Sequence, residues 1–143
     1  ILRDSYGIGM LFYLLFLIWF ADSSAYFSGK RFGKNKLLPN VSPGKTREGV
    51  AGAFVMSIIF SIVFAYYSDT VSDNNYLVFV LISFITVIFS IEGDLMESMF
   101  KRQVNIKDSS NILPGHGGIL DRIDSLTSAT PIFVTCLFLS GIE

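Results

Sequence analysis

Long apolar runs separated by short polar segments constrain this chain more than any other feature of its sequence. A helix needs about 20 apolar residues to cross a hydrocarbon layer of about 30 Å. The pattern therefore predicts an all-α fold, a polytopic transmembrane helix bundle of about four spanning helices. The expected spans are Tyr6–Phe27, Val50–Tyr67, Tyr76–Phe100 and a fourth from Ile119 or Leu120 to about Gly141.

Composition supports this prediction. Of the 143 residues, 51% are hydrophobic and 16% are charged, whereas soluble domains carry about 25% charged residues. The chain begins at Ile1 rather than Met, which we interpret as a piece of a longer protein. The single cysteine, Cys136, lies in an apolar run, permits no internal disulfide and is expected to be a buried packing residue.

The distribution of positive charge assigns sides to the membrane. Six of the eleven Lys and Arg residues lie between Lys30 and Arg47, and four lie between Lys101 and Arg122. The turn Ser68–Asn75 has none. By the positive-inside rule, two polar loops, residues 29–48 and 101–120, are expected to be cytoplasmic, and both termini lie on the opposite side. The net charge of −1 indicates neither a nucleic-acid binder nor an acidic tail.

Acidic residues are expected at the cytoplasmic ends of the spans. Asp22 lies near the end of the first, where a carboxylate is costly unless it faces a polar cavity or a partner. A capping or interfacial position for Asp22 is the alternative. Asp94 shares a helix face with Glu97 and Lys101, and these last two are spaced as an i,i+4 pair.

Two further acids, Asp121 and Asp124, lie three residues apart in the first turn of the fourth helix. Complementarity to the helix dipole would explain one of them. Several carboxylates without cysteine favour a hard cation such as Mg²⁺ over zinc. The candidate metal ligands are Asp22, Asp94, Asp121 and Asp124.

The segment Ser42–Thr46 has the ingredients of a phosphate contact. It combines a turn, a lysine (Lys45), a hydroxyl (Thr46) and a following helix N-terminus. It is not a P-loop, because the first glycine and the preceding strand are missing. The basic residues of 30–36 serve either to retain the loop in the cytoplasm or to attract anionic lipid head groups.

The second polar loop carries positive charge and a glycine-rich turn. Gly117 and Gly118 allow the backbone to approach a ligand closely. His116 is a candidate general acid, a phosphate donor or a turn-stabilising donor, and the residues leave these roles open. Together the polar segments predict a membrane enzyme that handles a polyphosphate with Mg²⁺ at the cytoplasmic face. A cation transporter is the rival class, but a large positive cluster would oppose cation passage.

Four polar segments carry a recognisable pattern. In the longest, over residues 98–124, the patterned positions are Ser98, Phe100, Lys101, Arg102, Lys107, Asp108, Ser110, Leu113, Pro114, His116, Gly117, Gly118, Ile119, Asp121, Arg122, Ile123 and Asp124. The others are residues 21–29, 41–49 and 93–98. This set resembles the signature of phosphatidate cytidylyltransferases, the CDP-diacylglycerol synthases. Ser24 departs from it, since glycine is commoner there in the family.

The resemblance implies that residues 1–143 are the C-terminal catalytic part of an integral membrane cytidylyltransferase whose N-terminal helices are absent. It implies transfer of the cytidylyl group of CTP to phosphatidate with Mg²⁺, giving CDP-diacylglycerol and pyrophosphate, at the cytoplasmic face of the bacterial inner membrane. The expected partners are CTP, phosphatidate and the lipid bilayer, without nucleic acid, and a homo-oligomer is left open. A CTP-dependent polyprenol or dolichol kinase is the nearest enzymatic rival.

The resemblance also suggests roles for single residues. Asp94 and Asp121 would be metal ligands, Asp124 an additional or neighbouring ligand, and Asp22 a further site residue. The expected catalytic residues are Asp94, Lys101, Arg102, Asp121, Arg122 and Asp124, and the expected substrate-binding residues are Ser42, Lys45, Thr46, Lys107, His116, Gly117 and Gly118.

Overall fold

The structure, a computed structural model, describes residues 2–68, 71, 73–103 and 120–142, with the backbone alone at positions 3, 4, 73 and 120–123. Two short strands pair antiparallel, and a single 3-10 turn, Asp73–Asn75, precedes the third helix. The predicted helical membrane fold is confirmed, with a small hairpin where a loop was expected. The elements are α1 (Leu2–Phe32), β1 (Lys36–Leu38), β2 (Ser42–Thr46), α2 (Arg47–Tyr67), α3 (Tyr76–Gln103) and α4 (Leu120–Ser140).

Three helices of the described chain are long and apolar enough to cross a membrane. They contain the stretches Ser5–Phe32, Arg47–Tyr67 and Tyr76–Gln103. The fourth predicted span coincides with the helix α4, but the described apolar part of α4, Asp124–Ser140, is shorter than a span, so membrane crossing by α4 stays a prediction. As expected, α3 continues beyond its apolar part in one unbroken helix, so its acidic end remains helical.

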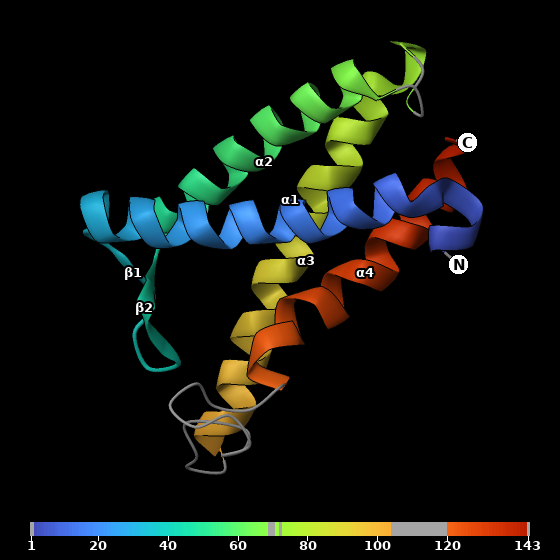
Figure 1. Ribbon diagram of the computed structural model, residues 1–143. Coiled ribbons are helices and arrows are strands. Elements are labelled where there is room, and N and C mark those ends of the chain that lie inside the picture. Colours follow the sequence, from blue (N-terminus) through green and yellow to red (C-terminus); the bar gives the residue numbers. More distant parts are fainter. Residues whose placement is uncertain (1, 69–70, 72, 104–119, 143) are drawn as a thin grey trace.

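The helices alternate in direction, so their ends fall into two groups (Figure 1). The end of α1, the hairpin, the start of α2, the end of α3 and the start of α4 lie toward one side. The two chain termini and the turn between α2 and α3 lie toward the other. This grouping agrees with the charge pattern, because the end of α3, with Lys101 and Arg102, lies toward the same side as the hairpin.

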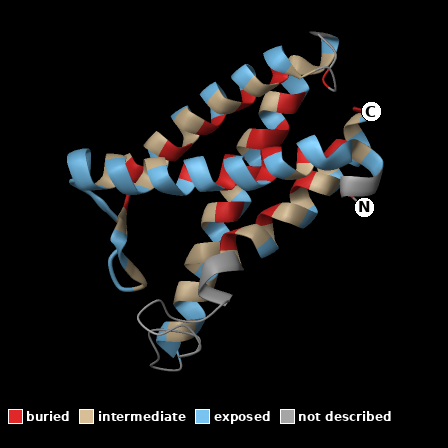
Figure 2. Cartoon of the chain, viewed as in Figure 1, coloured by how far each residue is buried: buried red, intermediate tan, exposed pale blue. Residues whose placement is uncertain are grey.

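Tyr13 of α1 lies at the centre of the bundle, with 1% of its surface exposed. Its ring centroid is 4.3 Å from that of Phe64 and 4.9 Å from that of Phe79. The rings of Phe60 and Phe133 lie 5.4 and 5.8 Å away. All four helices therefore contribute to one aromatic core, and buried residues follow the inward face of each helix (Figure 2).

Small residues form the buried face of α2. Gly49, Ala53, Ser57, Ser61 and Ala65 recur every four residues and are all buried. Small side chains let helices approach closely in a membrane. These small residues therefore form the face through which α2 packs in the bundle.

The closest helix contacts pair a glycine of one helix with a serine of another. At Gly93 of α3, an added Cβ would lie 2.5 Å from the Cβ of Ser128 on α4. At Gly52 of α2, it would lie 2.6 Å from the Cβ of Ser28 on α1. Because non-bonded carbons need about 3.5–4.0 Å, neither position has room for a side chain.

We predict that Gly93→Ala destabilises the protein by about 1–3 kcal/mol, the range for overpacking a tight contact. Removing the opposing side chain should recover stability, since Gly93→Ala with Ser128→Gly restores the missing space. Thermal unfolding in detergent measures both variants. Unchanged stability in Gly93→Ala, or no rescue in the double variant, would contradict this contact.

Candidate functional site

The β1–β2 hairpin stands at the polar end of the bundle and brings a lysine toward α3. Pro39 and Asn40 lie in its turn, as expected for residues that favour turns. The amide of Arg47, at the start of α2, donates to the carbonyl of Asn35 across the base of the hairpin, 3.0 Å away. The hairpin is thus joined to the first turn of α2.

The Glu48 carboxylate reinforces this junction. It accepts hydrogen bonds from the backbone amide of Asn35 at 3.2 Å and from its side-chain amide at 3.0 Å. Neither residue was singled out from the sequence as part of the site. An acid in the first turn of a helix is a weak signal, because the helix dipole alone explains it.

Thr46 caps α2, and its side chain is tightly packed. Its hydroxyl accepts a hydrogen bond from the Gly49 amide at 3.1 Å, and 5% of the residue surface is exposed. An added Cβ at Gly29 would lie 2.8 Å from the same hydroxyl oxygen. The glycines near the end of α1 and the start of α2 therefore let the two helices close around this threonine.

Lys45 forms a salt bridge with Asp94 of α3. The side chains are 24% and 33% exposed, so the pair is partly shielded from water. Residues 45 and 94 are far apart in sequence and are joined by the hairpin. The structure thus brings together two predicted site residues from different polar segments.

A row of charges extends from this pair to α4. The Asp124 carboxyl lies near those of Asp94 and Glu97 and interacts with both electrostatically. Glu97 forms the predicted i,i+4 salt bridge with Lys101 at 3.0 Å. Three adjacent carboxyl groups are thus flanked by two lysines, in the order Lys45, Asp94, Asp124, Glu97, Lys101.

Negative charge is crowded at the middle of this row. Asp124 lies at the polar start of α4, outside the three candidate spans. Burial raises the pKa of the Asp124 carboxyl above its ordinary value, and the neighbouring Glu97 raises it further. Carboxyl groups held this close favour a proton or a cation between them.

A cavity of about 290 Å³, which we call the polar cavity, lies beside the Lys45–Asp94 pair. It combines side chains from α1, the hairpin, α2 and α3. Its volume approaches the lower end of the range of small-molecule sites, about 300 Å³. The lining residues are Asp22, Ala25, Tyr26, Ser42, Gly44, Lys45, Thr46, Gly49, Val50, Ile91 and Asp94.

Asp22 faces this cavity from α1, so its carboxyl has the polar surroundings that a carboxylate near a membrane needs. The charges of Asp94, Lys45 and Asp124 all act on its carboxyl. Five predicted site residues therefore line one cavity, and Asp124 lies next to it. They are Asp22, Ser42, Lys45, Thr46 and Asp94.

Arg102, near the end of α3, lies on an exposed surface. Its Nε donates to the Val41 carbonyl in the hairpin turn at 3.4 Å. This contact joins the end of α3 to the hairpin. In the described chain Arg102 thus supports the hairpin from outside the polar cavity, and its predicted role toward a substrate stays a prediction.

Several predictions fall on residues that the structure does not describe. Lys107, His116, Gly117 and Gly118 lie outside the described residues, and so do the side chains of Asp121 and Arg122. Within the described part, no group of three or more His, Cys, Asp or Glu side chains converges as a metal site.

Three proteins named phosphatidate cytidylyltransferase are similar to this chain. Those of Haemophilus influenzae and Pseudomonas aeruginosa are each 52% identical over 134 residues, covering 92% and 93% of this chain. That of Bacillus subtilis is 45% identical over 137 residues, covering 94%. The matched regions are 46%, 49% and 50% of these proteins, so the chain spans about half their length.

Two further comparisons agree with this similarity. The sequence model of the cytidylyltransferase family matches residues 1–140. A solved structure described as an intramembrane enzyme for archaeal membrane lipids biosynthesis has the same fold, with a TM-score of 0.64 at 18% identity. The alignment covers 88% of this chain and 77% of that one.

We predict that Glu48→Ala loosens the hairpin, because the carboxylate that receives two hydrogen bonds from Asn35 is lost. Hydrogen–deuterium exchange should therefore speed up at the Asn35 amide, while exchange in the middle of α3 is unchanged. Unaltered protection of residue 35 would show that this contact does not hold the hairpin.

Proposed function

The chain belongs to the cytidylyltransferase family, and we propose that it transfers the cytidylyl group of CTP to phosphatidate, giving CDP-diacylglycerol and pyrophosphate. The observation that carries this proposal is the Lys45–Asp94 pair at the wall of the polar cavity. It places positive charge for a phosphate beside carboxylates suited to a cation. The names of the bacterial relatives support phosphatidate as the acceptor.

The reaction needs little acid or base chemistry. A phosphatidate oxygen, already anionic, forms a bond to the α-phosphorus of CTP, and the bond from that phosphorus to the bridging oxygen of the pyrophosphate group breaks. The difficulty is to hold two anions together, which fixed positive charge and positioning overcome. Lys45 from the hairpin and Lys101 from α3 are placed for this at the two ends of the carboxyl row.

Mg²⁺ is the cofactor that we propose. It binds through one or two carboxylates and completes its shell with water and substrate phosphates. Asp94 and Asp124 lie near each other, and Asp94 lines the polar cavity, which fits this demand. Asp121 would join them, and Asp22 faces the same cavity from α1. When bound, the ion would neutralise charge on the triphosphate.

The remaining predicted residues would bind the substrate phosphates, and most of them lie outside the described residues. Arg122, Lys107 and His116 would contact a phosphate, and Gly117 and Gly118 would allow close backbone approach. Ser42 and Thr46 reach the polar cavity from β2. The Thr46 hydroxyl accepts from Gly49 yet keeps its own proton to donate to a phosphate oxygen.

We place this site at the cytoplasmic face of the bacterial inner membrane. The positive-inside rule assigns the basic segments to the cytoplasm, and the hairpin, the end of α3 and the start of α4 lie on one side of the bundle (Figure 1). The relatives come from bacteria. CTP would then reach the polar cavity directly from the cytoplasm.

A CTP-dependent lipid kinase remains the rival reaction, and its products differ. Incubation with CTP, phosphatidate and Mg²⁺ should release pyrophosphate and form CDP-diacylglycerol. Release of CDP with a phosphorylated lipid would assign the kinase reaction instead. Equal turnover with a second nucleotide would overturn the choice of cytidine.

We predict that Asp94→Asn in the full-length protein lowers turnover by about 100-fold or more, because one cation ligand and the partner of Lys45 are lost together. Formation of CDP-diacylglycerol from CTP measures this effect. Glu92→Gln, on the same helix and exposed, is the matched control and should keep normal turnover. Near-normal activity in Asp94→Asn would refute its role as a ligand.

We also predict that Lys45→Met lowers kcat/KM for CTP by about 100-fold, the typical effect of losing one group that stabilises developing charge. Lys34→Met removes an exposed lysine before the hairpin and should have little effect. Steady-state kinetics at saturating phosphatidate measures kcat/KM for CTP in both variants. Equal losses in both variants would show that general positive charge, rather than Lys45, acts on the nucleotide.

A further inference from the structure

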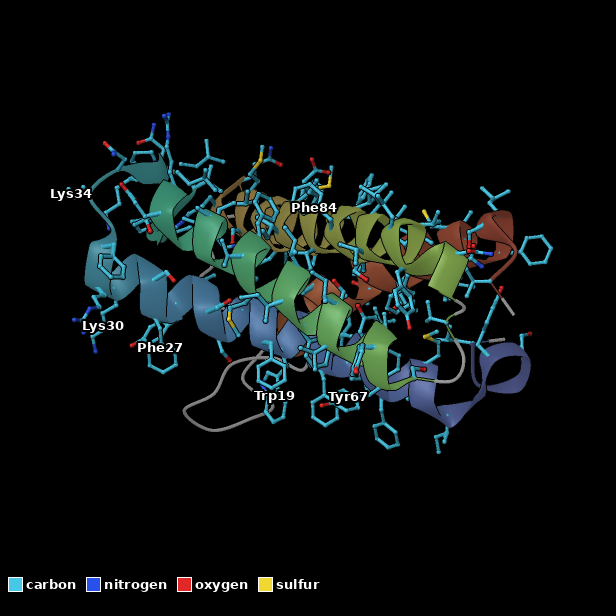
Figure 3. All side chains as sticks on the ribbon, turned by 90° about the horizontal axis from the view of Figure 1, so that it is seen from above. Trp19, Phe27, Lys30, Lys34, Tyr67 and Phe84 are labelled. Atoms are coloured by element: carbon cyan, nitrogen blue, oxygen red, sulfur yellow. The ribbon has the colours of Figure 1, made fainter. Side chains whose placement is uncertain are left out.

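The last two turns of α1 carry exposed aromatic rings and positive charge side by side. Phe27 is 68% exposed, and Figure 3 shows Phe27 and Lys30 projecting from α1 on the side away from α3. We call this surface the basic–aromatic patch. Its residues are Tyr26, Phe27, Lys30, Arg31 and Phe32, and all five are exposed.

The positive charge of the patch has aromatic rather than acidic neighbours. The Lys30 ammonium lies 5.8 Å from the ring centroid of Tyr26, and the Arg31 guanidinium lies 5.7 Å from that of Phe32. Among the described residues, neither cation forms a salt bridge. From residue 23 to residue 47 the sequence has six Lys or Arg and no Asp or Glu. The patch therefore presents uncompensated positive charge to its surroundings.

The length of α1 places the patch at a membrane surface. Its apolar stretch, Ser5–Phe32, has 28 residues, which is roughly 42 Å at 1.5 Å per residue. The hydrocarbon core is about 30 Å thick, and the bilayer with its head groups is about 40–45 Å thick. At a tilt of about 40°, the upper end of the usual range, the stretch still spans roughly 32 Å along the membrane normal. The last turns of α1 therefore reach the head groups.

An anionic lipid head group is the occupant that matches this patch. Amphipathic rings such as that of Tyr26 gather at the head-group level, and long basic side chains reach from there toward the phosphates. The cytoplasmic leaflet is negatively charged and attracts basic segments next to a spanning helix. An acidic peptide or a nucleic acid would match the charge, but the rings of Phe27 and Phe32 would then face water.

We propose that the basic–aromatic patch binds the head groups of anionic lipids that are not substrates of the enzyme. Lys30 and Arg31 would contact the lipid phosphate, while the rings beside them lie against the glycerol region and the upper acyl chains. This assigns a lipid site outside the polar cavity and so goes beyond the proposed function.

The patch borders the polar cavity at one residue. Tyr26 belongs to the patch and also lines that cavity. A lipid bound by Lys30, whose ammonium lies over the same ring, would hold the rim of the cavity without entering it. The negative charge of the surrounding leaflet would thereby help to fix the end of α1, which leads directly into the hairpin.

The experiment uses the full-length protein in phosphatidylcholine nanodiscs that contain a small fraction of a lipid with a photoactivatable diazirine next to its head group. Labelled phosphatidylglycerol and labelled phosphatidylserine should each modify residues 26–32 roughly fivefold more than labelled phosphatidylcholine, the gain from one charge near an anionic surface. Added salt should reduce this difference, because it screens exposed charges.

Three outcomes of the labelling overturn the proposal. Equal labelling by phosphatidylcholine and the anionic lipids would show that charge does not select the lipid. Labelling by phosphatidate alone, among the anionic lipids, would assign the patch to the substrate site. Labelling of residues 26–32 by none of the lipids would show that another segment of the protein covers the patch.

A charge-free variant and a charge-preserving control give a second readout. Lys30→Gln with Arg31→Gln should lower labelling by phosphatidylglycerol to the level of phosphatidylcholine, because the rings remain and the charges are lost. Lys30→Arg with Arg31→Lys keeps both charges and should retain the preference for the anionic lipid. A preference that survives in the Gln variant overturns the role of these two cations.

Labelling of the unmodified protein decides the proposal even if the Gln variant fails to fold. It is also independent of the proposed reaction. An anionic preference at residues 26–32 without formation of CDP-diacylglycerol would support the patch and reject the cytidylyl transfer. Formation of CDP-diacylglycerol without that preference would do the reverse.

Discussion

Close helix contact at the polar end of the bundle is the constraint on which the site depends. Lipid provides no hydrophobic drive for helices to associate, so packing and polar contacts must hold them together. The absence of a side chain at Gly93 lets α3 lie against Ser128 of α4. The next residue of α3 is Asp94, and its carboxyl then lies near that of Asp124. A glycine thus determines how near two charged groups can come.

Holding the Asp94 and Asp124 carboxyls close together would be costly without a compensating positive charge. The hairpin provides that charge. Carboxylates near a membrane must face a partner or a polar cavity, and Asp94 has both. Lys45 reaches it because the hairpin is held at its base by Asn35 and Glu48. Arg102 adds a contact from the end of α3. Residues outside the polar cavity, which hold the hairpin in place, therefore control the position of Lys45 inside it.

Much of this arrangement could be predicted from the sequence. Apolar length predicted the helices, the distribution of Lys and Arg predicted their alternation, and spacing predicted the Glu97–Lys101 pair. The hairpin could not be predicted, since β1 and β2 are only three and five residues long and have no hydrophobic alternation. The pairing of Lys45 with Asp94 depends on that hairpin. The aromatic core around Tyr13 joins four helices, and contacts between distant segments leave no trace in local periodicity.

The buried hydroxyls of the bundle bear on how the protein enters its membrane. Ser57 and Ser61 of α2 donate to carbonyls of their own helix, and so do Ser83 and Thr86 of α3. Each of these groups is satisfied before any neighbouring helix is present. α2 and α3 can therefore be released into lipid one at a time during synthesis without leaving these four hydroxyls unbonded. Asp94 differs, since its neighbours lie on the hairpin and on α4, which is synthesised after α3. The carboxyl row is thus completed only when α4 has been made, and a nascent chain halted before α4 would hold helices without it.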